Sequence, residues 1–155
     1  MKLETWELLS YIVTVFGFPL AIFAFMIEQR KERENEDEEV YQLLTADYTD
    51  FLKLVMANPD LQLRSNCEIT SLTEEQQERK LVIFEILISL FERAYLLSYD
   101  EKMSNKQLRR WRSWEDFMSE WCEREDFRKI LPRLLQGEDP DFAAHIKQLA
   151  AKFSA

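Results

Sequence analysis

The pattern of apolar and polar residues changes abruptly at residue 27. Residues 8–27 are twenty consecutive positions without a charge, and only Ser10 and Thr14 among them are polar. Twenty helical residues span roughly 30 Å, the thickness of the hydrocarbon core of a bilayer. A buried core helix of this length is rarely apolar on every face, and the acidic residues before the run are atypical of a cleaved signal peptide. We therefore predict a short N-terminal stub and a transmembrane helix within residues 1–27.

Basic residues beside the apolar run predict its orientation. Lys2 is the only base before it, whereas Arg30, Lys31 and Arg33 follow it directly. Cytoplasmic flanks carry the excess of Lys and Arg, and acids contribute little to this bias. We expect a single-pass protein of the cell (inner) membrane, with its N-terminus outside and its C-terminal domain cytoplasmic.

A charged segment and then a helical domain follow. Residues 28–39 contain seven acids and three bases, with no Gly or Pro, which predicts a charged helical stalk that continues from the span. From residue 40 onward, apolar residues recur at helical spacing until Asn58-Pro59 ends the pattern. The first such residues are Val40, Leu43, Leu44, Phe51, Leu54 and Val55. The expected domains are thus 1–27, 28–39 and 40–155.

Start and stop signals divide residues 40–155 into helices. Thr73 and Ser104 each precede a Gln by three residues, the spacing of a capping box. Pro140 follows an Asp and predicts the start of a final helix. We expect Pro132 to interrupt or kink the helix before it and Gly137 to end that segment. The predicted fold is all-α, with an antiparallel cytosolic bundle of four or five helices.

Residues 81–97 are apolar around most of the helical circumference. Glu78, Glu85 and Glu92 recur every seven residues and mark one polar stripe. A second membrane span would place charges at the helix centre, at about 2.5 to 3.5 kcal/mol each. We therefore expect a central helix of the bundle that is surrounded by the others.

Composition narrows the function classes. Two Gly and four Pro residues are too few for most many-stranded β-folds, and a net charge of −9 makes nucleic acid an unlikely partner. Cys67 and Cys122 form no metal-binding or disulfide pattern, and His145 is the only histidine. We predict no catalytic residue, no cofactor and no metal site, which disfavours a membrane-bound enzyme.

One helix combines tryptophans with bases. Residues 102–112 contain five bases and no acid, while Trp111, Trp114, Met118 and Trp121 follow at helical spacing. Three interpretations remain open: a core-facing stripe with a solvated basic flank, a subunit interface, or a ligand site. The interface interpretation pairs this helix with acids on a neighbouring copy. Its residues are Arg109, Arg110, Trp111, Arg112 and Trp114 on one side, and Glu74, Glu75 and Glu78 on the other.

The order of span (residues 8–27), charged stalk (28–39) and Trp/Arg-containing helical domain resembles small bacterial single-pass membrane proteins. Among them are the pore-forming membrane accessory proteins of RNA-targeting CRISPR systems. The resemblance lies in the order of the parts, with no shared motif, and it implies a cytosolic helical domain whose copies assemble.

Two functions follow as expectations. The first is a membrane protein that self-associates through its helical domain and forms a pore or a membrane-perturbing, defence-type effector. In that case Ser10, Thr14 and Gly17 are the expected contact or pore face of the span. The second is a membrane tether or adaptor that binds a cytosolic protein partner.

Overall fold

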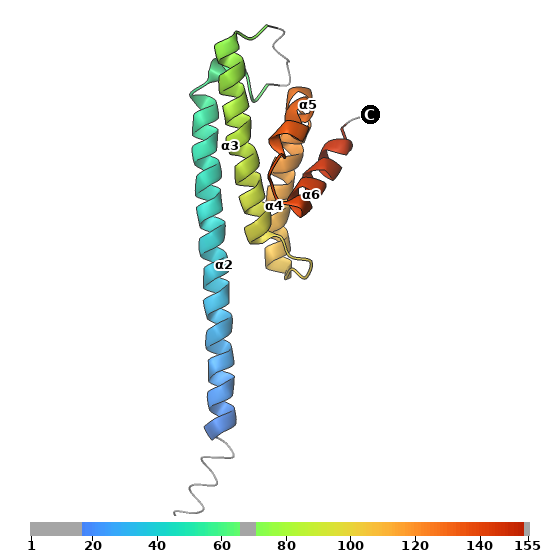
Figure 1. Cartoon of the computed structure of the whole chain (residues 1–155). Coiled ribbons are helices and arrows are strands. Elements are labelled where there is room, and N and C mark those ends of the chain that lie inside the picture. Colours follow the sequence, from blue (N-terminus) through green and yellow to red (C-terminus); the bar gives the residue numbers. More distant parts are fainter. Residues whose placement is uncertain (1–16, 66–70, 154–155) are drawn as a thin grey trace, which may run out of the picture. The chain divides into compact units, whose positions relative to one another are not determined.

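A computed structural model describes residues 17–65 and 71–153, and every regular element within them is helical (Figure 1). The elements are α2 (Phe18–Met56), the 3-10 helix η2 (Pro59–Leu61), α3 (Glu74–Ser98), α4 (Asn105–Cys122), α5 (Glu125–Leu134) and α6 (Pro140–Ala151). The predicted all-α bundle is therefore confirmed. The chain divides into two units, with the boundary between Glu39 and Val40.

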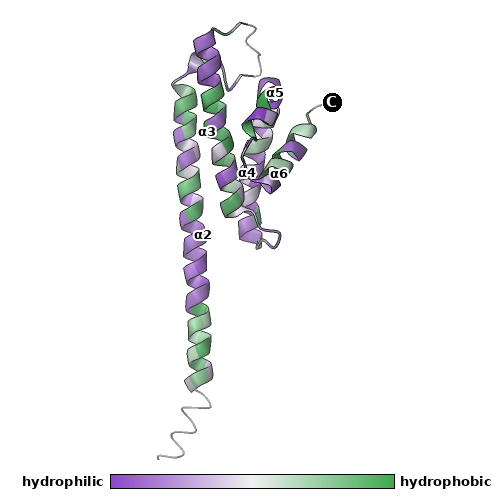
Figure 2. Cartoon of the chain, viewed as in Figure 1, coloured by the Kyte–Doolittle hydropathy of each residue, from purple (hydrophilic) through white to green (hydrophobic). Residues whose placement is uncertain are grey.

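The described part of the first unit is the beginning of α2. Its large apolar side chains between Phe18 and Ile27 are 41% to 70% exposed, and Figure 2 shows them followed by a hydrophilic segment. Within residues 17–65 and 71–153, no helix combines the length and the hydropathy needed to cross a bilayer. The predicted span lies partly outside the described residues, because these begin at residue 17.

Capping boxes mark the first residues of α3 and α4, as predicted. The Thr73 hydroxyl accepts a hydrogen bond from the Gln76 backbone N–H at 3.2 Å, and the Gln76 side chain accepts one from the Thr73 N–H at 3.0 Å. Ser104 and Gln107 repeat this reciprocal pair at 3.3 and 2.9 Å. Each box satisfies two N–H groups that a helix start leaves without a partner.

The last two helices match the prediction with one correction. Asp139 caps α6 by accepting hydrogen bonds from the backbone N–H groups of Asp141 and Phe142 at 2.9 and 3.0 Å. We expected Pro132 to interrupt or kink its helix, and the interruption is wrong, because α5 continues through Pro132 to Leu134. A proline lacks only its own backbone N–H, and helical bonding continues past Pro132, where the Leu135 N–H donates to the Leu131 carbonyl at 3.0 Å. Gly137 lies beyond that end with a φ of 96°, a left-handed conformation that glycine adopts readily.

Aromatic side chains fasten the second half of α2 to α4. The Tyr48 ring stacks on Phe117 with centroids 4.4 Å apart and meets Trp114 edge-on at 5.7 Å. The Trp121 indole N–H donates a hydrogen bond to the Tyr48 hydroxyl at 3.3 Å. Phe51 meets Trp121 edge-on at 5.6 Å. Offset and edge-on ring pairs add specific attraction to the area that they bury.

The expectation that α3 is surrounded on all sides is wrong. Its core-facing residues, such as Phe84 and Leu87, are fully buried against α4, α5 and α6. The opposite side is open, with Val82 52% exposed, Ile86 43% and Leu97 52%. An apolar pattern around a whole helix does not reveal which sides the other helices cover, and here part of α3 lacks a cover within the described chain.

Arg124 joins the end of α4 to the connection that follows η2. Its guanidinium donates hydrogen bonds to the backbone carbonyls of Leu63 at 2.9 Å and Ser65 at 2.8 Å. The same group pairs with Asp126 at 2.8 Å, and the ammonium of Lys80 lies 3.3 Å from the Asp126 carboxylate. Arg124 and Asp126 are only 12% exposed, so this largely buried cluster is paired throughout.

Candidate functional site

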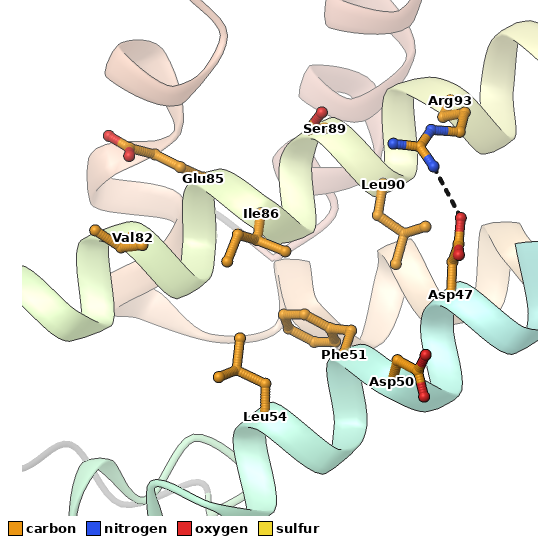
Figure 3. Close-up of a pocket in the computed structure, with 10 residues that line it drawn as sticks. All are labelled: Asp47, Asp50, Phe51, Leu54, Val82, Glu85, Ile86, Ser89, Leu90 and Arg93. Carbon is orange, nitrogen blue, oxygen red and sulfur yellow. Dashed lines mark hydrogen bonds and ion pairs between the residues drawn. The ribbon is translucent and has the colours of Figure 1, made fainter.

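An open groove of about 600 Å³ lies between the second half of α2 and the outer side of α3 (Figure 3). We call it the α2–α3 groove. From α2 it is lined by Asp47, Asp50, Phe51 and Leu54, and from α3 by Val82, Glu85, Ile86, Ser89, Leu90 and Arg93. Figure 3 shows Phe51 and Leu54 pointing across the groove toward Ile86 and Leu90. Apolar side chains thus form the floor of the groove and polar ones its edges.

The polar edge of the α2–α3 groove is predominantly acidic. Asp47 pairs with Arg93 at 2.8 Å, and Asp50 pairs with Lys53 at 2.8 Å on an exposed part of the helix. Glu85 has no ion-pair partner among the described residues. Three carboxylates and one guanidinium among the lining residues give the groove a net negative charge.

The sequence contained a weak signal for this groove. Asp47, Asp50 and Leu54 are spaced by three and four residues and share one face of α2, as Val82, Ile86 and Arg93 do on α3. Both faces mix charged with apolar residues, so hydropathy alone assigns them neither to the core nor to solvent. Their significance appears only when α2 and α3 lie side by side.

The tryptophans of α4 belong to the core. Trp111 and Trp114 are 3% and 1% exposed, which agrees with the interpretation of the stripe as core-facing. The guanidinium of Arg110 lies 4.8 Å from the centroid of the Tyr41 ring, at a cation–π distance. Arg109 and Arg112 are exposed, and neither has an ion-pair partner among the described residues. Near its start, α4 therefore offers Arg109 and Arg112 to another molecule, whereas its tryptophans are buried.

The acids predicted to face these bases lie at the start of α3. Glu75 is 3.5 Å from Arg79, whereas Glu74 and Glu78 line a second groove of about 630 Å³ together with Lys80 and Arg133. Helices α3 and α4 are antiparallel, so the start of α3 and the start of α4 lie at opposite ends of the pair (Figure 1). Within one chain the two charged groups stay apart.

The residues proposed for the membrane span are only partly described. Ser10 and Thr14 lie outside the described residues, and Gly17 is the first residue inside them. The predicted pore face therefore lies almost entirely outside the described residues.

His145 sits in an aromatic environment. Its ring packs against Tyr95 and Trp111 with centroids 5.4 and 5.5 Å apart, and its Nε2 is 3.7 Å from the Glu115 carboxylate. Burial lowers the pKa of His145, an effect that Glu115 opposes. The neutral imidazole is therefore favoured at neutral pH, in keeping with a packed ring.

Cys122 is fully buried, and burial raises the pKa of its thiol to about 12. A thiol that stays protonated is a poor nucleophile and a poor metal ligand. Cys67 lies outside the described residues. Among the residues that are described, no group of three or more His, Cys, Asp or Glu side chains is placed to hold a metal ion.

Two carboxyl groups meet where α5 is connected to α6. Glu92 accepts a hydrogen bond from the Asp139 backbone N–H at 2.5 Å, and the Glu138 carboxyl lies beside it. The hydrogen bond with Glu92 and burial raise the pKa of Glu138 to about 7. Burial and the neighbouring Glu92 carboxyl thus favour the protonated form of Glu138.

No protein-family model, curated protein or solved structure gives a significant match to this chain.

Proposed function

We propose that this protein is a membrane tether whose helical domain, residues 40–155, binds a protein partner at the cytoplasmic face of the membrane. The observation that carries this proposal is the α2–α3 groove, an open apolar surface with a charged edge. Exposed apolar surfaces rimmed by polar residues are typical of protein-binding sites. Apolar burial also supplies more affinity than exposed charge pairs, which contribute about 0 to 1 kcal/mol each.

The anchor in this proposal is the apolar segment of residues 8–27. Phe18, Phe23 and Phe25 in its described part are 61% to 69% exposed. Lipid is the environment that removes such side chains from water without requiring a second protein. The flanking bases Arg30, Lys31 and Arg33 support a cytoplasmic position for the helical domain.

The anchor is tested by expressing the full chain in a bacterial host. After carbonate washing, the chain should remain in the membrane pellet, and a C-terminal reporter should be active in the cytoplasm. Recovery of the full chain in the soluble fraction would reject the anchor. Recovery of a chain shortened near residue 25 would indicate a cleaved signal instead.

Self-association is the second candidate, and the placement of charges favours it. Glu74 and Glu78 lie in the first turns of α3, and Arg109 and Arg112 lie in the first half of α4, which runs antiparallel to α3. Unlike charges at opposite ends suit a head-to-tail contact between copies, which closes into a ring when the rotation permits it. Such a ring brings several spans together, as a pore lined by Ser10, Thr14 and Gly17 requires.

The particle mass of the detergent-solubilised chain separates the two candidates. A monomer supports the tether and rejects the pore, because one span cannot enclose a water path. A ring would favour self-association. Arg109→Glu with Arg112→Glu should then dissociate the ring, and adding Glu74→Lys with Glu78→Lys should restore it. This result would make self-association the main function. Circular dichroism at 222 nm should be unchanged in all of these variants.

A further inference from the structure

We propose that the α2–α3 groove binds an amphipathic helix of a separate protein, with one apolar face and Lys or Arg beside it. This inference rests on the proposed function, in that it names the chemistry of the tethered partner. It starts from the lining residues of the groove, all of which belong to the described part of residues 40–155.

The shape of the groove favours a helix. It lies between two antiparallel helices, and its α3 wall extends from Val82 to Arg93, roughly 17 Å at 1.5 Å per residue. That length matches about three turns of a third helix packed between them. A small molecule would remain largely in water in an open groove, whereas ligand sites bury most of the ligand surface.

The floor of the groove specifies an apolar face on the bound helix. Phe51 and Leu90 are 4% and 6% exposed and form the bottom. Val82 and Ile86 are 52% and 43% exposed and remain available for contact. A helix that carries leucine-like residues at positions i, i+4 and i+7 places them along such a floor.

The charges at the edge specify bases on the bound helix. Asp47, Asp50 and Glu85 surround the floor, and Arg93 is already paired with Asp47 at 2.8 Å. Glu85 is the carboxylate without a described partner, so a Lys or Arg of the bound helix adds a new ion pair there. Complementary charge at the edge selects partners and accelerates their association.

The same charges argue against two other occupants. Two copies of this chain that met groove to groove would bring the acids of both grooves together, and like charges across an interface are unfavourable. Helix α4 of a second copy would offer Arg109 and Arg112 to the groove but none of its tryptophans, because these are buried in the core of that copy. An anionic membrane surface would likewise be repelled by the acidic edge.

The test uses the full chain in dodecyl maltoside and fluorescein-labelled peptides of about 16 residues, long enough for the three turns estimated above. One peptide carries Leu at i, i+4, i+7 and i+11 with Lys beside these positions, and the matched peptide carries Glu in place of Lys. Fluorescence anisotropy measures the affinity of each. We expect the basic peptide to bind at least about tenfold more tightly than the acidic one.

Two pairs of substitutions then probe the groove itself. Val82→Ser with Ile86→Ser should weaken binding of the basic peptide at least about tenfold, because the floor loses its apolar contact. Asp50→Lys with Glu85→Lys should weaken the basic peptide and strengthen the acidic one, which is the reversal expected of direct charge pairing.

Matched controls use exposed residues that do not line the groove. Leu96→Ser removes an apolar side chain that is 57% exposed. Asp116→Lys on α4 with Glu123→Lys directly after it repeats the change in net charge away from the groove. Both controls should bind the basic peptide as the wild type does. Equal weakening by the controls, or equal affinity for the two peptides, overturns the proposal.

The remaining outcomes are also decisive. A chain that is dimeric without peptide and becomes monomeric with Val82→Ser and Ile86→Ser has a second copy in the groove, which overturns the proposal. Melting curves check that each variant is folded. Peptide binding is measured separately from membrane retention. Absence of peptide binding would therefore reject the groove proposal without rejecting the membrane anchor. A soluble chain that binds the peptide would reject the anchor without rejecting the groove proposal.

Discussion

Helices α3 and α4 both carry apolar side chains at helical spacing, but the two helices use them differently. In α4 the large apolar residues Trp111, Trp114, Met118 and Trp121 are all buried in the core of the domain. In α3 one face is buried to the same degree, while Val82, Ile86 and Leu97 remain exposed. The apolar residues of α4 therefore belong to the core that stabilises the domain, and the outer face of α3 is a surface left for binding.

The largest test of this comparison is Trp114→Ala. Trp114 is 1% exposed and contacts the rings of Tyr48 and Phe117, so its removal leaves a cavity between α2 and α4. We expect the free energy of unfolding to fall by about 3 to 5 kcal/mol. Urea denaturation of the full chain in detergent, followed by circular dichroism, measures the change. A loss below about 1 kcal/mol would show that α4 is not the core helix.

Tyr48→Phe tests the contact that fastens α2 to α4 with a smaller change. The ring is kept, but the Trp121 indole N–H loses the hydroxyl that accepts its hydrogen bond at 3.3 Å. A buried donor without a partner costs about 1 to 3 kcal/mol. The same denaturation curves report the loss. Tyr41→Phe on the same helix is the matched control, and an equally large effect there would contradict the role of the buried hydrogen bond.

Glu138→Gln tests how the connection between α5 and α6 is held against α3. The pKa of Glu138 is raised to about 7, so the folded protein keeps a proton that the unfolded chain releases near pH 4.5. The stability that this proton contributes is present below pH 4.5 and is lost as the pH rises through 7. Thermal melts from pH 5 to 8 should show the wild type losing stability relative to Glu138→Gln.

The effect of Glu138 is read from the difference in stability between the wild type and Glu138→Gln. This difference is needed because His145 changes the stability with pH in the opposite direction. Burial lowers the pKa of His145, so its contribution is present above pH 6.5 and is lost as the pH falls. Both proteins contain His145, and its effect cancels in the difference. Parallel melting curves over this pH range would contradict the raised pKa of Glu138.

Val82→Ser should have the smallest effect. Val82 is 52% exposed on the outer face of α3, and surface substitutions usually change stability by no more than about 0.5 kcal/mol. The melting curve should therefore match that of the wild type, even though peptide binding in the groove is weakened. A destabilisation as large as that of Tyr48→Phe would mean that Val82 is part of the core after all.

The elements of the fold were largely predictable because their signals are local. The Thr73 and Ser104 capping boxes and Pro140 each act within one helical turn, so residue type and spacing sufficed. The tryptophan stripe of α4 was open to three interpretations, because a stripe predicts only that one face is covered. Its partners, Tyr48 and Phe51 on α2, decide between them.

The α2–α3 groove was not predictable, because it depends on which side of α3 the other helices leave uncovered. Residues 81–97 are apolar on several faces, and nothing in that segment distinguishes Leu87, which is fully buried, from Ile86, which is 43% exposed. Tyr48 was missed for a related reason. It continues the spacing of Leu44, Phe51 and Val55, but a residue with a polar hydroxyl does not stand out in an apolar pattern.

The Arg124 contacts have a consequence for the order in which the domain forms. Leu63 and Ser65 are more than fifty residues before Arg124, so the hydrogen bonds that the Arg124 guanidinium donates to their carbonyls close a long loop of chain. Contacts between residues so far apart in the sequence form slowly, because a long loop of chain must close first. The backbone around Leu63 and Ser65 should therefore gain protection from proteases late in folding. Cleavage of the Leu63–Arg64 bond then reports the opening of the α4–α5 junction rather than local fraying.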